Sequence, residues 1–175
     1  MTCIVGLVDK GTVYIGGDSA GVAGLSISIR GDEKVFINGS FIMGFTTSFR
    51  MGQLLRYKFD PPKQTHSQND MQYMTTDFID AVRKCFIDNG FGTAASGGTF
   101  LVGYNKKLYT IDGDFQVGIP SCNYDTVGCG SDLALGAMHA TRNLKIKPED
   151  RIKKALEAAV EFNAGVRPPF VILKV

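Results

Sequence analysis

The sequence has few of the residues that build metal sites or disulfide frameworks. Its 175 residues include four cysteines, which are scattered and form no CxxC pair, and two histidines, His66 and His139, which lie far apart. We therefore expect no metal, no cofactor and reduced thiols of the kind found in the cytoplasm. A solvated or incidental role is the simpler interpretation of each histidine.

Excess charge and long apolar runs are also scarce. Nineteen basic residues stand against seventeen acidic ones, a net charge of only +2, which predicts binding neither to nucleic acid nor to a membrane surface. No apolar run reaches the roughly 20 residues of a membrane span. The N-terminus lacks a basic stretch followed by an apolar core, so no signal peptide is predicted. We expect a cytoplasmic protein with a single domain over residues 1–175.

Residue patterns in the first third of the chain predict a meander of antiparallel strands. Tight turns are indicated at Asp9-Lys10-Gly11 and at Asn38-Gly39, the latter a strong hairpin signal. The glycine-bearing segment Asp18–Gly24 is expected to be a loop. The expected strands are 2–8, 12–17, 26–29, 33–37 and 40–45.

Helical periodicity then alternates with further strand signals. The expected helices are 48–59, 71–87, 131–142 and 148–162, and the expected strands are 99–104, 107–112, 114–117, 126–128 and 170–175. Strands and helices are thus segregated into runs rather than alternating one by one. This order predicts an α+β domain in which two antiparallel sheets stack face to face with helices outside.

Three polar residues stand at strand ends and suggest a catalytic site. If Met1 is removed, Thr2 carries both a hydroxyl and a free α-amine, which is a nucleophile beside its own base. The amine has a pKa of about 8 and can accept the hydroxyl proton near neutral pH. The ammonium of Lys34 would favour loss of the amine's proton, and Asp18 could hold that ammonium in place. Each residue alone has an ordinary structural explanation, so the joint pattern carries the hypothesis.

These residues lie within short motifs that resemble those of proteasome β-type subunits and of HslV, which are N-terminal nucleophile (Ntn) hydrolases. Thr2-Cys3-Ile4-Val5-Gly6 resembles the opening strand of that family, and Gly16-Gly17-Asp18-Ser19 resembles its aspartate segment. Lys34-Val35 and Gly128-Cys129-Gly130-Ser131 resemble two further elements. The resemblance covers nearly the whole chain in element order, and it implies a four-layer αββα sandwich.

The resemblance also implies roles for individual residues. Thr2 would be the nucleophile, Lys34 would tune its hydroxyl, and Asp18 would support Lys34. The loop after Gly44 would supply the N–H that receives the oxyanion, with Gly44, Thr46 and Thr47 as candidates. A plain strand-end glycine is an equally good interpretation of Gly44. The substrate pocket would lie near Ala20, residues 28–31 and this loop.

Three residues depart from the family pattern around this core. Cys129 stands where the family has serine, and Ser131 could take part of that role or serve as a helix N-cap. Asn163 occupies the position of a family aspartate, and Val166 that of a serine. These departures alter the surroundings of Thr2 and leave Thr2, Asp18 and Lys34 unchanged.

The sequence therefore predicts a threonine-type endopeptidase that hydrolyses polypeptides within a ring of identical subunits. A partner ATPase would be a separate chain, because no GxxxxGK[ST] phosphate loop is present. Two alternatives stay open. One is a catalytically silent ring-forming or binding protein with the same fold, and the other is an amidohydrolase acting on a small amide.

Overall fold

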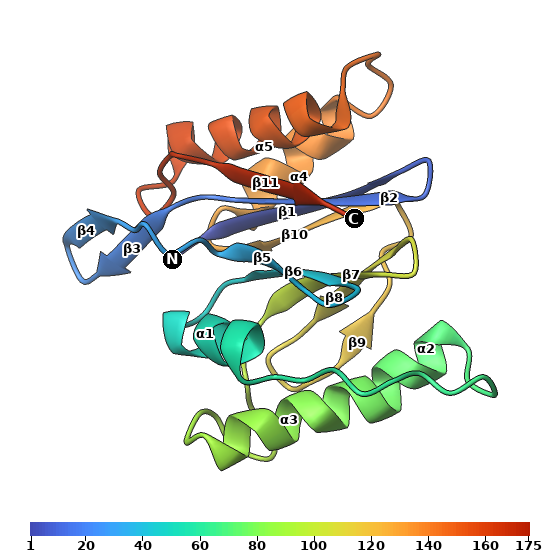
Figure 1. Cartoon of the computed structure of the whole chain (residues 1–175). Coiled ribbons are helices and arrows are strands. Elements are labelled where there is room, and N and C mark those ends of the chain that lie inside the picture. The colour runs from blue at the N-terminus through green and yellow to red at the C-terminus, as the bar shows by residue number, and fades with distance from the viewer.

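The computed structural model describes residues Met1–Val175 and contains two stacked antiparallel sheets (Figure 1). The first sheet has the strand order β10 (Tyr124–Gly128), β1 (Cys3–Asp9), β2 (Thr12–Gly17) and β11 (Val171–Lys174). The second has the order β5 (Val35–Asn38), β6 (Phe41–Phe45), β7 (Phe100–Tyr104), β8 (Lys107–Ile111) and β9 (Val117–Gly118). Most strands pair with a neighbour in sequence, whereas β10 and β11 return from the far end of the chain to flank β1 and β2.

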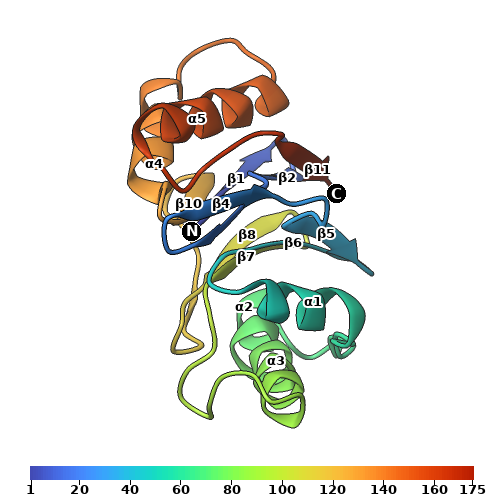
Figure 2. The same ribbon diagram turned by 90° about the vertical axis from the view of Figure 1, so that its left-hand side faces the viewer.

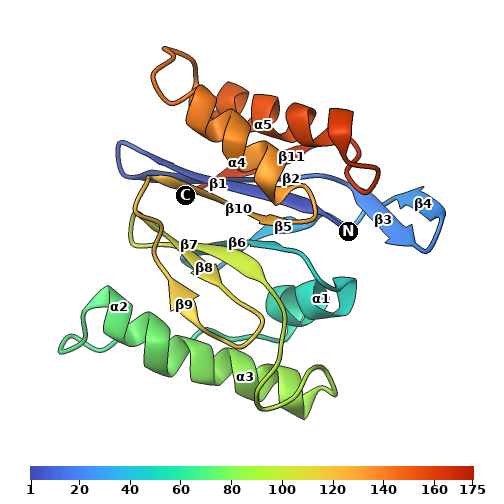
Figure 3. The ribbon, with the colours of Figure 1, turned by 180° about the vertical axis from the view of Figure 1, so that it is seen from behind.

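Helices cover the outer face of each sheet. The first sheet is covered by α4 (Ser131–Ala140) and α5 (Pro148–Phe162), and the second by α1 (Phe49–Tyr57), α2 (Asp70–Tyr73) and α3 (Ile79–Asp88) (Figures 1 and 3). A π-helical turn over Met74–Phe78 joins α2 to α3. The predicted α+β architecture, a four-layer αββα sandwich, is confirmed. None of the helices is both long and apolar enough to cross a membrane.

Three apolar clusters hold the four layers together. An aromatic-rich cluster lies between the second sheet and α1, α2 and α3, and an aliphatic cluster lies between the first sheet and α4 and α5. The third cluster fills the space between the sheets and consists of Ile4, Val13, Ile15, Val35, Ile42, Leu101, Leu108 and Val127. This third cluster fixes the position of one sheet relative to the other.

Two glycines let the sheets approach closely. A Cβ atom added at Gly44 would lie 2.6 Å from Cγ2 of Ile4 and 2.7 Å from Cγ2 of Ile15, both on the first sheet. A Cβ added at Gly103 would lie 2.6 Å from Cγ1 of Val13. Branched side chains of the first sheet therefore rest directly on the glycine backbone of the second.

A third, two-stranded sheet projects from the body beside the N-terminus. It is formed by β3 (Ala20–Ala23) and β4 (Ser26–Ile29) (Figures 1 and 2). The predicted loop at Asp18–Gly24 is thus wrong for residues 20–23. The Ala-Gly-Val-Ala sequence of β3 has weak strand propensity, and it is extended because it pairs with β4 in register from Ala20–Ile29 to Ala23–Ser26.

Two smaller expectations were also wrong. Only the last residue of the expected strand 114–117 is in a strand, because Phe115 has a φ of +69° and its ring is buried in the aromatic cluster. Ser131 is not the N-cap of α4. Gly130 holds that position, and Ser131 is the first helical residue.

Candidate active site

Thr2 lies at the entrance to β1, where the projecting hairpin meets both sheets. The residue is only 4% exposed. Its amide N–H donates to Sγ of Cys129 at 3.2 Å, and its carbonyl oxygen accepts from the amide of Gly130 at 3.3 Å. The hydroxyl donates to the carbonyl oxygen of Met1. Both Thr2 atoms with catalytic potential are therefore held by hydrogen bonds.

Asp18 follows β2 and is fixed by four donors. Its Oδ1 accepts from Nζ of Lys34 at 2.8 Å and from the amide of Cys3 at 3.0 Å. Its Oδ2 accepts from the amides of Ala20 at 2.9 Å and Arg167 at 3.2 Å. Because the Cys3 amide belongs to the peptide unit that follows Thr2, this carboxylate connects the buried lysine directly to the backbone of the candidate nucleophile.

Lys34 is a buried cation just before β5. The residue is 2% exposed, and Asp18 is its only ion-pair partner. Burial lowers the pKa of Lys34 from its ordinary value, because desolvation disfavours the charged form, while the charge and hydrogen bond of Asp18 oppose that shift. The carbonyl oxygen of Lys34 accepts from the amide of Phe45 at 3.1 Å, which ties the residue to the end of β6.

Cys129 and Asn163 form a second hydrogen-bonded unit on the other side of Thr2. The Cys129 thiol donates to Oδ1 of Asn163 at 3.3 Å, and Nδ2 of Asn163 donates to the Cys129 carbonyl at 2.7 Å. Oδ1 also accepts from the amide of Gly165 at 2.8 Å. Asn163 thus donates and accepts at once, which an ionised aspartate could not do.

The remaining departures lie in the supporting structure. Val166 is fully buried in the cluster beneath α4 and α5, and a Cβ added at Gly130 would lie 2.9 Å from its Cγ2. The Ser131 hydroxyl lies 3.5 Å from Oδ1 of Asp132, and the Ser131 carbonyl accepts from the Thr126 hydroxyl at 2.9 Å. Ser131 makes no hydrogen bond with Thr2.

The loop after β6 offers one free donor. Gly44 lies within β6, paired with Val35 and Leu101, and its place is explained by the close approach of the sheets. The Thr46 amide donates to the Thr99 carbonyl at 3.1 Å. Thr47 has a φ of +63°, and its amide donates to no group of the chain. Of the three candidate donors, Thr47 is the one left for an oxyanion.

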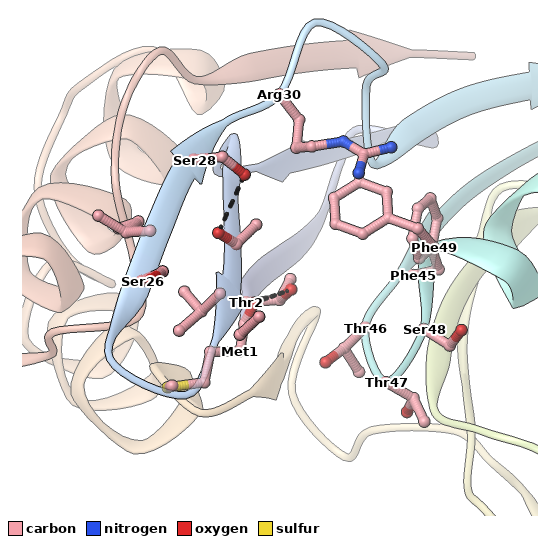
Figure 4. A pocket seen from close by; sticks show the side chains of 14 residues that line it. Met1, Thr2, Ser26, Ser28, Arg30, Phe45, Thr46, Thr47, Ser48 and Phe49 are labelled. Atoms are coloured by element: carbon pink, nitrogen blue, oxygen red, sulfur yellow. Dashed lines mark hydrogen bonds between the residues drawn. The ribbon is translucent and has the colours of Figure 1, made fainter.

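A pocket of about 290 Å³ opens beside Thr2 (Figure 4). The projecting hairpin forms one wall, and the loop from β6 into α1 forms the other. The lining residues are Met1, Thr2, Gly21, Val22, Ala23, Ser26, Ile27, Ser28, Arg30, Phe45, Thr46, Thr47, Ser48 and Phe49. Residues 28 and 30 and the loop after Gly44 match the expected pocket region, whereas Ala20 is buried and does not line it.

Sequence reasoning missed two contributors to this region. Arg167 donates its amide to Asp18 from 149 positions away, and the Ser19 hydroxyl donates to the Pro169 carbonyl at 2.6 Å. No local sequence pattern predicts either hydrogen bond. Arg30 lies within the expected pocket segment 28–31, but its pairing with Asp32 was not predicted.

Comparison with known proteins gives a match in structure and none in sequence. No family model and no curated protein matches the chain. BPH of Thiobacillus denitrificans, solved in complex with epoxomicin, superposes with a TM-score of 0.83 at 19% identity, covering 99% of this chain and 98% of that one. The fold is that of the proteasome-like Ntn hydrolases.

Two further structures with this Ntn fold agree with that result. Eukaryotic HslV from Trypanosoma brucei has a TM-score of 0.71 at 17% identity and covers 99% of this chain and 98% of that one. The Gly-1 mutant of Anbu from Hyphomicrobium sp. strain MC1 has a TM-score of 0.71 at 14% identity, with 98% and 80% covered. The resemblance predicted from short motifs is confirmed for the fold. At these identities, the chemistry has to be argued from the residues of this chain.

Proposed function

We propose that this protein is a threonine-type peptidase subunit in which Thr2, freed of Met1, is the nucleophile. The buried Asp18–Lys34 ion pair, with Nζ and Oδ1 2.8 Å apart, carries this proposal. Taking such a pair out of water costs free energy, so its burial alone is weak evidence for a stabilising role. Here the pair is bonded to the backbone beside Thr2, where a fixed positive charge can act on the amine and the hydroxyl.

The reaction follows from the groups around Thr2. The neutral α-amine takes the hydroxyl proton as Oγ1 attacks the substrate carbonyl carbon, and the Lys34 ammonium stabilises the developing alkoxide. The amide of Thr47 receives the oxyanion. Collapse breaks the C–N bond, and the protonated amine returns the proton to the leaving group. Water, activated by the same amine, then hydrolyses the acyl ester.

Cys129 orients the amine in this scheme. Its thiol hydrogen is directed at Asn163, so the sulfur accepts from the nitrogen of Thr2. An N–H held by sulfur leaves the lone pair of the amine free for the hydroxyl proton. The Cys129–Asn163 unit can therefore replace the serine and aspartate found at these positions in the family that the motifs resemble.

The wider setting is proposed with the activity. We propose one domain over residues 1–175, assembled with copies of itself into a ring in the cytoplasm, acting on polypeptides and served by a separate ATPase unfoldase. The full-length overlap with BPH and HslV supports this setting. The silent ring protein is the second candidate, favoured by the neutral Asn163 in place of a carboxylate.

Intact mass spectrometry of protein expressed in bacterial cytosol is the first test. We expect the mass of the chain without Met1, because methionine before a small residue is normally trimmed. The trimmed protein should cleave short fluorogenic peptides, and epoxomicin should add its mass to it. Thr2→Ala is the matched control, since Met1 is trimmed before alanine too, and it should do neither.

Three results would contradict the proposal. Full retention of Met1 would leave the Thr2 nitrogen in a peptide bond, without its function as a base. Trimmed, folded rings that cleave no peptide and take up no epoxomicin would point to the silent protein. Cleavage of small amides by a monomer, with no cleavage of peptides, would point to the amidohydrolase.

A further inference from the structure

Arg30 extends across the mouth of the pocket beside Thr2 and is held from three sides (Figure 4). Its Nε and Nη2 donate to the two carboxylate oxygens of Asp32 at 2.6 and 2.5 Å. Its guanidinium carbon lies 4.1 Å from the centre of the Phe49 ring. Its aliphatic stem rests on Gly21, where an added Cβ would lie 3.1 Å from Cγ. A side chain fixed in this way loses little further freedom on binding a ligand.

The lining of the pocket has a pronounced chemical bias. Arg30 is its only charged side chain, and no carboxylate lines it. Six hydroxyl groups line the same space, on Thr2, Ser26, Ser28, Thr46, Thr47 and Ser48. The hydroxyls of Ser28 and Thr2 already donate to the carbonyls of Gly21 and Met1. The other hydroxyls and the guanidinium are together a set of donors for a small anionic group. An aromatic wall of Phe45 and Phe49 closes one side.

We propose that this pocket binds a carboxylate side chain of the substrate, glutamate or aspartate, at the residue that precedes the scissile bond. Arg30 is the residue that determines this specificity. The inference rests on the proposed peptidase function, because it assigns a substrate class to that same site. A lysine or arginine side chain in the pocket would find no carboxylate in the lining, and Asp32 is already paired with Arg30.

Asp32 does not cancel this role. It engages Nε and Nη2 of Arg30, and Nη1 donates to no group of the chain. Asp32 does not line the pocket, so its carboxylate holds the guanidinium without contributing to the lining. The competing explanation is that the Arg30–Asp32 pair only stabilises the turn after β4, in which case substrate preference would not depend on Arg30.

The test compares matched peptides on the trimmed protein. Fluorogenic peptides that differ only in Glu, Gln, Leu or Lys before the scissile bond are assayed with wild type and with Arg30→Gln, Arg30→Lys and Arg56→Gln. Arg56 is the control, because it lies on α1 and pairs with Glu33 at 3.6 Å outside the pocket. The kcat/KM ratio of Glu to Gln is the readout, and thermal melts and ring size verify folding.

We expect wild type to prefer Glu over Gln by about ten-fold or more, as a charge-assisted hydrogen bond allows. Arg30→Gln should bring the ratio near one, Arg30→Lys should restore part of it, and Arg56→Gln should leave it unchanged. A ratio near one in wild type, or a preference that survives in Arg30→Gln, would overturn the inference.

A binding arm separates this inference from the proposed function. N-acetyl peptide amides that end in Glu or Gln are titrated against trimmed Thr2→Ala protein and its Arg30→Gln derivative by calorimetry. Tighter binding of the Glu peptide that needs Arg30 supports the inference even if wild type cleaves nothing, in which case only the peptidase proposal fails. Equal binding of the two peptides overturns the inference whether or not peptides are cleaved.

Discussion

The amide nitrogen of Thr2 and the sulfur of Cys129 lie 3.2 Å apart and share a hydrogen bond. After removal of Met1, that nitrogen becomes the α-amine, so an exposed thiol adjoins the proposed general base. Modification of Cys129 would fill the space beside the amine and displace it from the hydroxyl.

Alkylation of Cys129 is therefore expected to inhibit the trimmed enzyme. Iodoacetamide should lower peptidase activity by about 100-fold, the scale of a displaced general base. Cys3 should stay unmodified near pH 8, because burial raises the pKa of its thiol to about 12. Peptide mapping locates the adducts.

Two variants control the alkylation experiment. Cys122→Ser removes the other exposed thiol and should remain sensitive to the reagent. Any activity that Cys129→Ser retains should be insensitive to it. Inhibition of equal depth in Cys129→Ser would show that the reagent acts elsewhere.

Removal of the Asp18 carboxylate should destabilise the fold strongly. Asp18→Ala leaves the Lys34 ammonium buried without a partner and deprives the amides of Cys3, Ala20 and Arg167 of their acceptor. We expect a loss of about 3–5 kcal/mol in the free energy of unfolding. Urea denaturation measures the change.

Asp32→Ala is the matched control for the ion pair. It breaks the pair with Arg30, whose side chains are 37% and 43% exposed. Exposed pairs contribute below about 1 kcal/mol, so the loss should be much smaller than in Asp18→Ala. Equal losses in the two variants would contradict the structural role given to Asp18.

The activity should depend on pH through Lys34. Activity should rise with pH as the α-amine loses its proton, and that rise should occur below the amine's unperturbed pKa of about 8 because the Lys34 ammonium favours the neutral amine. It should fall again as the Lys34 ammonium deprotonates, and that fall should occur below pH 10.5, because burial lowers the pKa of Lys34 from that value. The profile of kcat/KM against pH tests both limbs.

The lowered pKa of Lys34 also affects stability, which should rise over the pH range in which activity falls. A lysine whose pKa is lowered in the folded state binds its proton more tightly in the unfolded chain. Stability should therefore rise with pH between the lowered pKa and 10.5.

In Lys34→Arg, any remaining activity should lack the alkaline fall, because arginine does not titrate in this range. An unchanged fall in Lys34→Arg would assign it to another group.

Gly44 should prove to be a packing residue. Gly44→Ala places a methyl group 2.6 Å from Ile4 and 2.7 Å from Ile15, and such overpacking costs about 1–3 kcal/mol. Gly136→Ala in α4 is the control. No atom lies within 4 Å of its added methyl, and we expect a gain of roughly 0.5–1 kcal/mol. Thermal melts distinguish the two, and a neutral Gly44→Ala would contradict this view of the sheet interface.

The sequence was most informative where local pattern and tertiary structure agree. Strand periodicity around Thr2 and the Asn38-Gly39 turn predicted five of the first six strands. The expected single meander is divided among three sheets, and β3 was not predicted. Helical periodicity located all four helical segments to within a few residues. These features depend on side chains that repeat along one element, so a single sequence contains the necessary information.

The rest depends on contacts between distant segments. The Ala20–Ala23 strand exists through its pairing with β4, and Asp18 takes a donor from Arg167 across 149 positions. In the sequence, Asn163 only replaces a charged aspartate by a neutral residue. Its simultaneous hydrogen bonds to Cys129 and Gly165 depend on the tertiary structure. Such relationships are set by the packing of layers, which local residue patterns do not encode.

The proposed site spans two independently hydrogen-bonded sheets. Thr2 and Asp18 belong to the ends of the first sheet, whereas Lys34 and Thr47 flank strands of the second. The contacts of Ile4 and Ile15 with the backbone of Gly44 limit how closely the two sheets can approach each other. Apolar residues that do not contact the substrate therefore set the positions of Thr2, Lys34 and Thr47 relative to one another. Substitutions at those apolar residues would change the reaction rate by moving the reacting groups, while the reacting groups themselves stayed the same.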